Sequence, residues 1–169
     1  MSVAYDVTRP GALGDDPSFE NEYLQALRLI ERLHRLLLDV IKDEFDRNGG
    51  ADLNSVQALL LYNIGDSELT AGELKKRGYY LGSNVSYNLK KLVDMGYIDC
   101  RESATDKRSK IVRLTDKGMN ACGVVNGLYE RQLQSIETVG EVGSDDLEVL
   151  NQSLVRLERF WTDQIRYRL

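Results

Sequence analysis

Residues 83–118 read SNVSYNLKKLVDMGYIDCRESATDKRSKIVRLTDKG, and this stretch decides the fold. Apolar residues recur at helical spacing through its first part, and Gly96 ends the pattern as a helix-terminating glycine does. Residues 97–102 and 110–114 are then rich in β-forming residues, and the polar residues 103–109 separate them. Two such runs joined by a short polar segment predict a β-hairpin. The stretch therefore predicts a helix followed by a hairpin.

A capping box marks another helix just upstream. Thr70-Ala-Gly-Glu73 fits that pattern, so we expect a short helix from Thr70 to Gly78. Two helices joined by a brief connection and followed by a basic hairpin, the wing, are the parts of a winged helix-turn-helix. The second helix has one apolar face and one face suited to hydrogen bonding with DNA. The candidate DNA-binding residues on this second face are Ser83, Asn84, Ser86, Tyr87, Lys90 and Lys91.

Long helices are expected on both sides of this module. Helical patterns cover residues 19–47 and 54–64 before it, and residues 115–136 after it, and a last helix opens at Ser144. The last helix carries an apolar stripe made of Leu147, Leu150, Leu154, Leu157, Trp161 and Ile165. The predicted fold class is mostly α, an α+β winged helix, with four helices, a two-stranded hairpin and two further helices.

This order predicts three regions. Residues 1–18 would form a flexible N-terminal arm, residues 48–114 a winged helix-turn-helix DNA-binding domain, and residues 19–47 with 115–169 a helical dimerisation region. The terminal helices are too apolar for a solitary small domain, so we expect them to interlock with a second copy of the chain. A two-fold dimer would present its two recognition helices roughly 34–36 Å apart, one turn of DNA, and would bind a pseudo-palindromic operator.

The net charge of −5 hides a strong asymmetry along the sequence. Residues 75–118 contain eleven Lys and Arg against five Asp and Glu, whereas the remainder contains eleven basic and twenty-two acidic residues. A basic module inside an acidic frame is the charge pattern of a phosphate-binding surface. A merely solvated basic face is the alternative.

Other classes of function find little support in the sequence. His34 is the only histidine, and Cys100 and Cys122 lack the spacing of a zinc site, so we expect no metal and no cofactor. No nucleotide-binding or hydrolytic motif is present, and no catalytic constellation can be assembled around one histidine, so an enzyme is not expected. No apolar run is long enough to cross a bilayer, so we expect a cytoplasmic protein with no membrane partner.

Three motifs in this module resemble the MarR family of bacterial transcription regulators. They are Gly96-Tyr97-Ile98 after the recognition helix, Asp106-Lys107-Arg108 in the wing, and Leu114-Thr115-Asp116-Lys117-Gly118 after the hairpin. The match extends from Leu74 to Gly118, and outside it the resemblance rests on the order of the helices.

The resemblance implies a homodimeric regulator, a repressor or an activator, that binds double-stranded operator DNA. It assigns Arg108 to the minor groove and Asp106 to bracing the wing, with Lys107 and Lys110 beside them as DNA-binding candidates. Tyr87 departs from the family pattern, since relatives often have arginine there, and Cys100 stands where a basic residue is common. The operator sequence therefore cannot be transferred from relatives.

The resemblance also implies a small aromatic or phenolic effector, often an anion, wedged where the module joins the terminal helices. The first two helices must pass this junction, which makes His34, Leu38, Leu59, Tyr62 and Asn63 the candidate ligand-binding residues. His34 and Tyr62 are also compatible with ordinary helix-surface or interface roles, and the two cysteines with ordinary packing or with thiol sensing.

A winged-helix protein-interaction module without DNA binding is the competing interpretation, because fold does not fix function. Such a module has no need to expose Ser83, Asn84 and Tyr87 or to project Arg108 beyond the hairpin.

Overall fold

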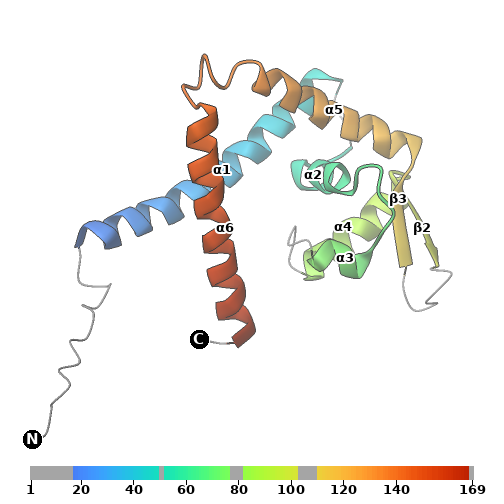
Figure 1. The fold of residues 1–169 in the computed structure, drawn as a ribbon. Coiled ribbons are helices and arrows are strands. Elements are labelled where there is room, and N and C mark those ends of the chain that lie inside the picture. The colour runs from blue at the N-terminus through green and yellow to red at the C-terminus, as the bar shows by residue number, and fades with distance from the viewer. Residues whose placement is uncertain (1–16, 50–51, 77–81, 103–109, 168–169) are drawn as a thin grey trace, which may run out of the picture. The chain divides into compact units, whose positions relative to one another are not determined.

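The computed structural model describes residues 17–49, 52–76, 82–102 and 110–167. The chain divides into two compact units between Val56 and Gln57. The first unit contains the long helix α1 (Pro17–Arg47) and the second contains the winged module and the two C-terminal helices (Figure 1). The predicted arm 1–18 lies almost wholly outside the described residues, which begin at Pro17.

Local chemistry sets both ends of α1. Pro17 occupies its first position, where a missing backbone N–H costs nothing, and Glu20 complements the helix dipole in the first turn. At the other end, Asn48 Nδ2 donates to the Glu44 carbonyl oxygen at 2.7 Å. The expected helix 19–47 is thus confirmed with two more residues at its start.

The described residues of the second unit form eight elements, if the helix that crosses the division is included. In chain order they are α2 (Ser55–Ile64), β1 (Leu69–Thr70), α3 (Ala71–Lys76), α4 (Gly82–Asp94), β2 (Ile98–Glu102), β3 (Lys110–Leu114), α5 (Asp116–Leu133) and α6 (Ser144–Tyr167). The strands form an antiparallel sheet in the order β1-β3-β2. Cys100 pairs with Val112 across the hairpin, and Leu69 of β1 pairs with the same Val112 from the other side.

The predicted hairpin is confirmed as β2 and β3, and β1 adds a third strand that was not predicted. With only two residues, β1 is too short to show the alternation by which strands are recognised in a sequence. Thr70, expected to open a helix, is both the last residue of β1 and the cap of α3. Its Oγ1 accepts from the Glu73 N–H at 3.1 Å, and its own N–H donates to Glu73 Oε2 at 2.6 Å, which confirms the capping box.

The core of the second unit lies among the helices of the winged module, its sheet and α5. Its largest fully buried side chains come from α2, which contributes three, and from α3, α4 and α5, which each contribute one. They are Leu60, Leu61, Ile64, Leu74, Leu92 and Val125. The sheet adds Ile98 and Val112, both almost fully buried. One apolar core therefore fixes the position of α4 against the hairpin.

A junction around the backbone of Tyr97 joins the recognition helix, the hairpin and α5. Gly96 has φ +76°, a left-handed conformation that favours glycine and lets the chain turn from α4 into β2. The Thr115 N–H donates to the Tyr97 carbonyl oxygen at 3.0 Å, and the Thr115 hydroxyl lies 2.7 Å from the Gly96 carbonyl oxygen. Thr115 Oγ1 also accepts from the Gly118 N–H at 3.2 Å, so one residue caps α5 and closes the hairpin.

The C-terminal helices differ slightly from their predicted limits. Helix α5 ends at Leu133 rather than near Ile136, because the chain continues as turns up to the connection before α6. Helix α6 begins at Ser144, where the preceding Gly143 N–H donates to Asp146 Oδ2 at 3.0 Å. Among the helices of the described residues, none is long and apolar enough to cross a membrane.

Gly118 should be intolerant of any side chain. A Cβ atom built there would lie 2.2 Å from the Tyr97 carbonyl oxygen, a backbone atom that cannot move without opening the junction. We expect Gly118→Ala to lower the free energy of unfolding by about 2–3 kcal/mol, as overpacking does, measured by denaturant unfolding of the full chain at fixed protein concentration.

Gly123→Ala in the same helix is the matched control. A Cβ atom there meets nothing within 4 Å. Helix propensity alone should then raise stability by up to about 1 kcal/mol. Equal effects of the two substitutions would show that the close approach to Tyr97 does not constrain the fold.

Candidate nucleic-acid interface

Helix α4 separates an inward apolar face from an outward polar one. Leu89 and Leu92 are buried, whereas Tyr87, Lys90 and Lys91 are exposed. The Tyr87 side chain is 64% exposed, and Lys91 Nζ lies 5.8 Å from the centre of its ring. An α-helix fits the major groove of DNA, and exposed polar side chains like these can contact base edges there.

The remaining predicted residues of α4 follow the same face or lie at its start. Ser86 is exposed. Ser83 and Asn84 belong to the first turn of α4, and their side chains fall outside the described residues.

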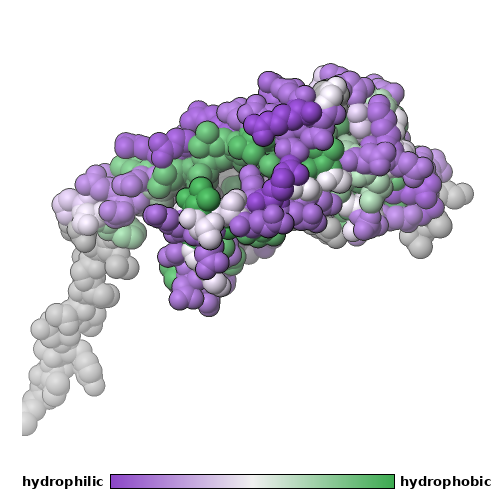
Figure 2. All heavy atoms as spheres, turned by 90° about the horizontal axis from the view of Figure 1, so that it is seen from above, coloured by the Kyte–Doolittle hydropathy of each residue, from purple (hydrophilic) through white to green (hydrophobic). Residues whose placement is uncertain are grey.

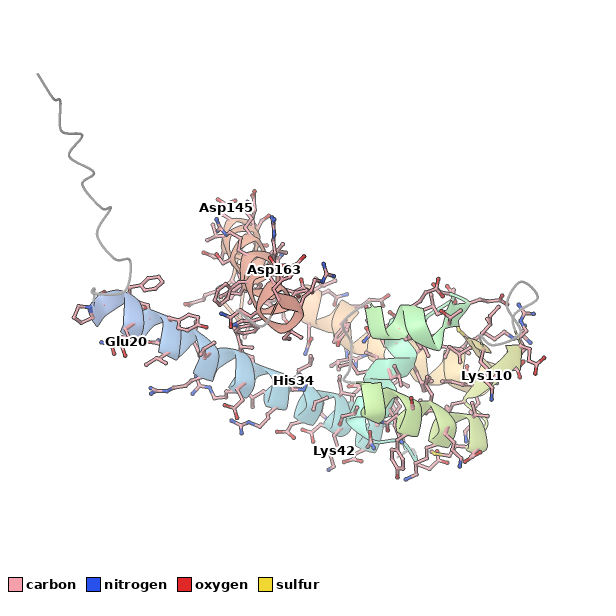
Figure 3. The ribbon with its side chains drawn as sticks, turned by 90° about the horizontal axis from the view of Figure 1, so that it is seen from below. Glu20, His34, Lys42, Lys110, Asp145 and Asp163 are labelled. Atoms are coloured by element: carbon pink, nitrogen blue, oxygen red, sulfur yellow. The ribbon has the colours of Figure 1, made fainter. Side chains whose placement is uncertain are left out.

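The tip of the wing, with Asp106, Lys107 and Arg108, falls within residues 103–109, outside the described residues. Lys110 is exposed as the first residue of β3 (Figure 3). The described part of the wing therefore offers one of its four predicted DNA-binding residues.

Three other basic residues of the module are engaged in holding it together. Arg113 pairs with Asp99 directly across the hairpin, with Nε and Nη2 at 3.2 Å and 2.9 Å from Asp99 Oδ2. Arg101 of β2 forms an ion pair with Glu68, which precedes β1. The first pair joins two neighbouring strands, and the second joins β2 to the residue before β1.

Lys117 is also held in place, at the junction rather than on the sheet. Its Nζ donates to the Met95 carbonyl oxygen at 3.0 Å and lies 4.0 Å from the centre of the Tyr97 ring. Among the described residues, by contrast, Lys90, Lys91 and Lys110 form no ion pair. Among the described side chains of the module, the positive charge that remains for phosphates thus lies on α4 and at the start of β3.

A polar pocket of about 360 Å³ opens between α2 and α5. It brings together two of the candidate ligand-binding residues, Tyr62 and Asn63. Sequence reasoning missed its other lining residues, because no motif links the end of α2 to α5. They are Gly65, Asp66, Met119, Cys122 and Asn126.

The other three candidate ligand-binding residues do not line this pocket. Leu59 is half-buried on α2, beside the residues that do. His34 is exposed midway along α1, and Leu38, one turn further on, is half-buried (Figure 3). Their role in ligand binding stays a prediction.

The electrostatics of the pocket disfavour negative charge. Burial raises the pKa of the Cys122 thiol, and the nearby Asp66 charge raises it further. Burial also raises the pKa of Tyr129, whose ring meets that of Tyr62 edge-on at 5.0 Å. A buried thiol with a raised pKa holds little thiolate at neutral pH, which favours ordinary packing over thiol sensing at Cys122.

Within the described ranges, no group of three or more His, Cys, Asp or Glu could hold a metal ion. Both cysteines are free; Cys100 is half-buried and Cys122 is buried. A helix-turn-helix with an exposed polar recognition helix and a hairpin beside it defines a winged DNA-binding protein.

Comparisons with known proteins agree with this class. The family model described as winged helix DNA-binding domain matches residues 53–118. The exopolysaccharide II synthesis transcriptional activator ExpG of Rhizobium meliloti (strain 1021) is 39% identical over 148 residues, which cover 86% of this chain and 74% of that protein.

Solved structures share the fold at lower identity. The regulator SlyA superposes with a TM-score of 0.70 at 19% identity, covering 85% of this chain and 99% of that one. A mutant MarR from E. coli complexed with operator DNA superposes with a TM-score of 0.64 at 22% identity. The superposition covers 81% of this chain and 96% of that one. FabT of Streptococcus pneumoniae in complex with DNA superposes with a TM-score of 0.60 at 21% identity. The superposition covers 88% of this chain and 99% of that one.

The chain belongs to the MarR family of winged helix-turn-helix transcription regulators. It is a DNA-binding transcription regulator and not an enzyme. The predicted family and fold class are confirmed.

Proposed function

We propose that the protein acts as a homodimer that binds a pseudo-palindromic operator through α4 and the wing. The exposed face of α4 carries this proposal, because Tyr87, Lys90 and Lys91 project from a helix whose other side is fixed in the core. Two of the solved structures that share this fold, those of MarR and FabT, are complexes with DNA. The exposure of Tyr87 also speaks against a protein-interaction module that hides this face.

Each part of the interface would make a different contact with DNA. Helix α4 would lie in the major groove, where Ser83, Asn84, Ser86 and Tyr87 meet base edges and Lys90 and Lys91 meet phosphates. The wing would place Arg108 in the minor groove, whose negative potential attracts a guanidinium, with Asp106 bracing it and Lys107 and Lys110 beside it. Because its relative ExpG is named a transcriptional activator, we propose that this protein also activates transcription.

Dimerisation is supported by apolar surface on α6. Although α6 has 24 residues, none of them is buried, and Leu150, Leu154 and Phe160 are between 39% and 50% exposed. Hydrophobic side chains, green in Figure 2, are plainly exposed on the face shown there. A helix of this length gains most of its stability from packing, so an uncovered α6 requires a partner surface.

Salt dependence of DNA binding tests the phosphate contacts. We expect the full chain to bind DNA from upstream of its own gene with an affinity that falls steeply as salt rises. Lys90→Gln should reduce the slope of log K against log salt by about 1 for each half-site, because it removes one phosphate contact. Fluorescence anisotropy over a salt series measures both quantities.

The control removes a structural charge pair instead. The double substitution Asp99→Asn with Arg113→Gln keeps the net charge and should leave the slope unchanged.

Arg108→Ala should cost about 1–3 kcal/mol of binding free energy at matched salt while the dimer stays intact. A wild-type protein without salt-sensitive binding would contradict the proposed function, and unchanged affinity in Arg108→Ala would remove that residue from its assigned role.

The dimer interface can be tested with adjacent residues of α6. Leu154 belongs to the apolar stripe, whereas Val155 points away from it by the geometry of a helix, and both are exposed in the single chain. Leu154→Glu should dissociate the dimer, since each buried carboxylate costs several kcal/mol, and Val155→Glu should not. Analytical ultracentrifugation measures the masses. A monomeric wild-type protein, or equal behaviour of both variants, would contradict this interface.

A small effector is proposed to act at the pocket between α2 and α5, with Tyr62 and Asn63 in its wall. His34, Leu38 and Leu59 remain in the proposed ligand set at the junction with the terminal helices. Asp66 is the single charged group among the described residues that line the pocket, and its carboxylate opposes an anion. We therefore expect a neutral or cationic aromatic compound to be preferred over an aromatic acid.

Benzylamine and benzoate form a matched pair of probes, similar in size and opposite in charge at neutral pH. Benzylamine should bind more tightly, because the Asp66 carboxylate in the pocket wall attracts its ammonium group. Asp66→Asn should abolish the preference. Calorimetry measures both affinities in the wild-type protein and in the variant. Tighter binding of benzoate, or a preference that survives Asp66→Asn, would contradict the assignment.

A further inference from the structure

Tyr87 combines an aromatic ring with a position on the exposed face of the recognition helix. Its side chain is 64% exposed, so packing within the chain does not account for a large ring at this place. The neighbouring lysines, Lys90 and Lys91, are charged and suited to phosphates, whereas the Tyr87 ring is mostly apolar. The Tyr87 ring therefore offers a large apolar group to whatever this face of the helix contacts.

The ring is also held in an orientation suited to contact. Lys91, one turn after Tyr87, places Nζ 5.8 Å from the ring centre, which is within cation–π range. Side chains on a helix lean toward its N-terminus, so the ring leans toward the first turn of α4. That first turn is the part of a recognition helix that approaches base edges most closely.

We propose that Tyr87 reads a thymine in each half-site through the C5-methyl group of that base. This inference rests on the proposed function, since it requires α4 to lie in the major groove. Among the four bases, thymine alone presents an apolar group in that groove, and the other edges present hydrogen-bond donors and acceptors. A mostly apolar ring is complementary to the methyl group, and Lys91 beside it would hold a phosphate without reading sequence.

The contact predicts a specific sensitivity to the methyl group. Deoxyuridine has the hydrogen-bonding edges of thymidine and lacks only this methyl. Loss of one buried methyl should weaken binding about fourfold for each half-site, from the transfer free energy of a CH₂ group. If Tyr87 instead recognised the base through a hydrogen bond of its hydroxyl group, loss of the methyl group would leave the affinity unchanged.

The experiment scans the operator with single thymidine-to-deoxyuridine replacements. The duplex is the upstream DNA segment that the full chain protects in footprinting, and affinities are measured by anisotropy at one salt concentration. We expect one thymine in each half-site at which the wild-type protein loses about fourfold in affinity. Tyr87→Phe should keep this sensitivity because it keeps the ring, and Tyr87→Ala should abolish it.

Lys90→Gln, on the same helix but without a contact to the Tyr87 ring, provides the matched control. It should weaken binding to the thymidine and deoxyuridine duplexes equally and should flatten the salt dependence. Circular dichroism of every variant checks the fold, and Tyr87→Phe, which removes one exposed hydroxyl, keeps the test valid if Tyr87→Ala unfolds.

Three results would overturn the proposal. They are a wild-type protein that binds the duplex but responds to no replacement, a response that persists in Tyr87→Ala, and a response that is lost in Tyr87→Phe. Failure of the proposed function is a distinct result, because the wild-type protein would then show no salt-sensitive binding to any duplex.

Discussion

The carbonyl group of Tyr97 is the point on which the winged module depends. It accepts from the Thr115 N–H, and Gly118 approaches it so closely that no side chain fits. The same few residues end the recognition helix, begin the hairpin, close it and start α5. Because α4, the wing and α5 all meet at this contact, the angle between helix and wing is set by backbone geometry. Lys117, held at Met95 and over the Tyr97 ring, covers the junction from outside.

The basic residues whose side chains the structure describes in the module divide into two groups with different tasks. Arg101, Arg113 and Lys117 are engaged by partners inside the module, so their charges stabilise the sheet and the junction. Exposed ion pairs of this kind contribute little energy each, but they pin side chains between strands. Lys90 and Lys110 stay exposed and unpaired among the described residues. Among the described side chains, phosphates would therefore meet the charges of α4 and of the start of β3 first.

Much of this organisation could be predicted from the sequence, because it arises from local chemistry. The capping box at Thr70, the caps of α5 and α6, and the apolar face of α4 each lie within a few residues of the feature they predict. The third strand was missed because two residues show no period, and its pairing with Val112 joins distant segments. The pocket beside Asp66 was missed for the same reason, since α2 and α5 are far apart in sequence. The predicted DNA contacts on the wing tip lie outside the described residues and remain predictions.

Charge along the chain also constrains how the protein can approach DNA. Outside residues 75–118 the chain carries twice as many acidic as basic residues, so phosphates repel those parts and attract the winged module. Helix α6 begins with Asp145 and Asp146 in its first turn, where negative charge favours the helix dipole. These two carboxylates thus stabilise the helix that carries the apolar stripe, and their negative charge repels phosphate from its first turn. In the proposed dimer, the apolar surface would face a second copy of the chain and the basic surface would face the operator.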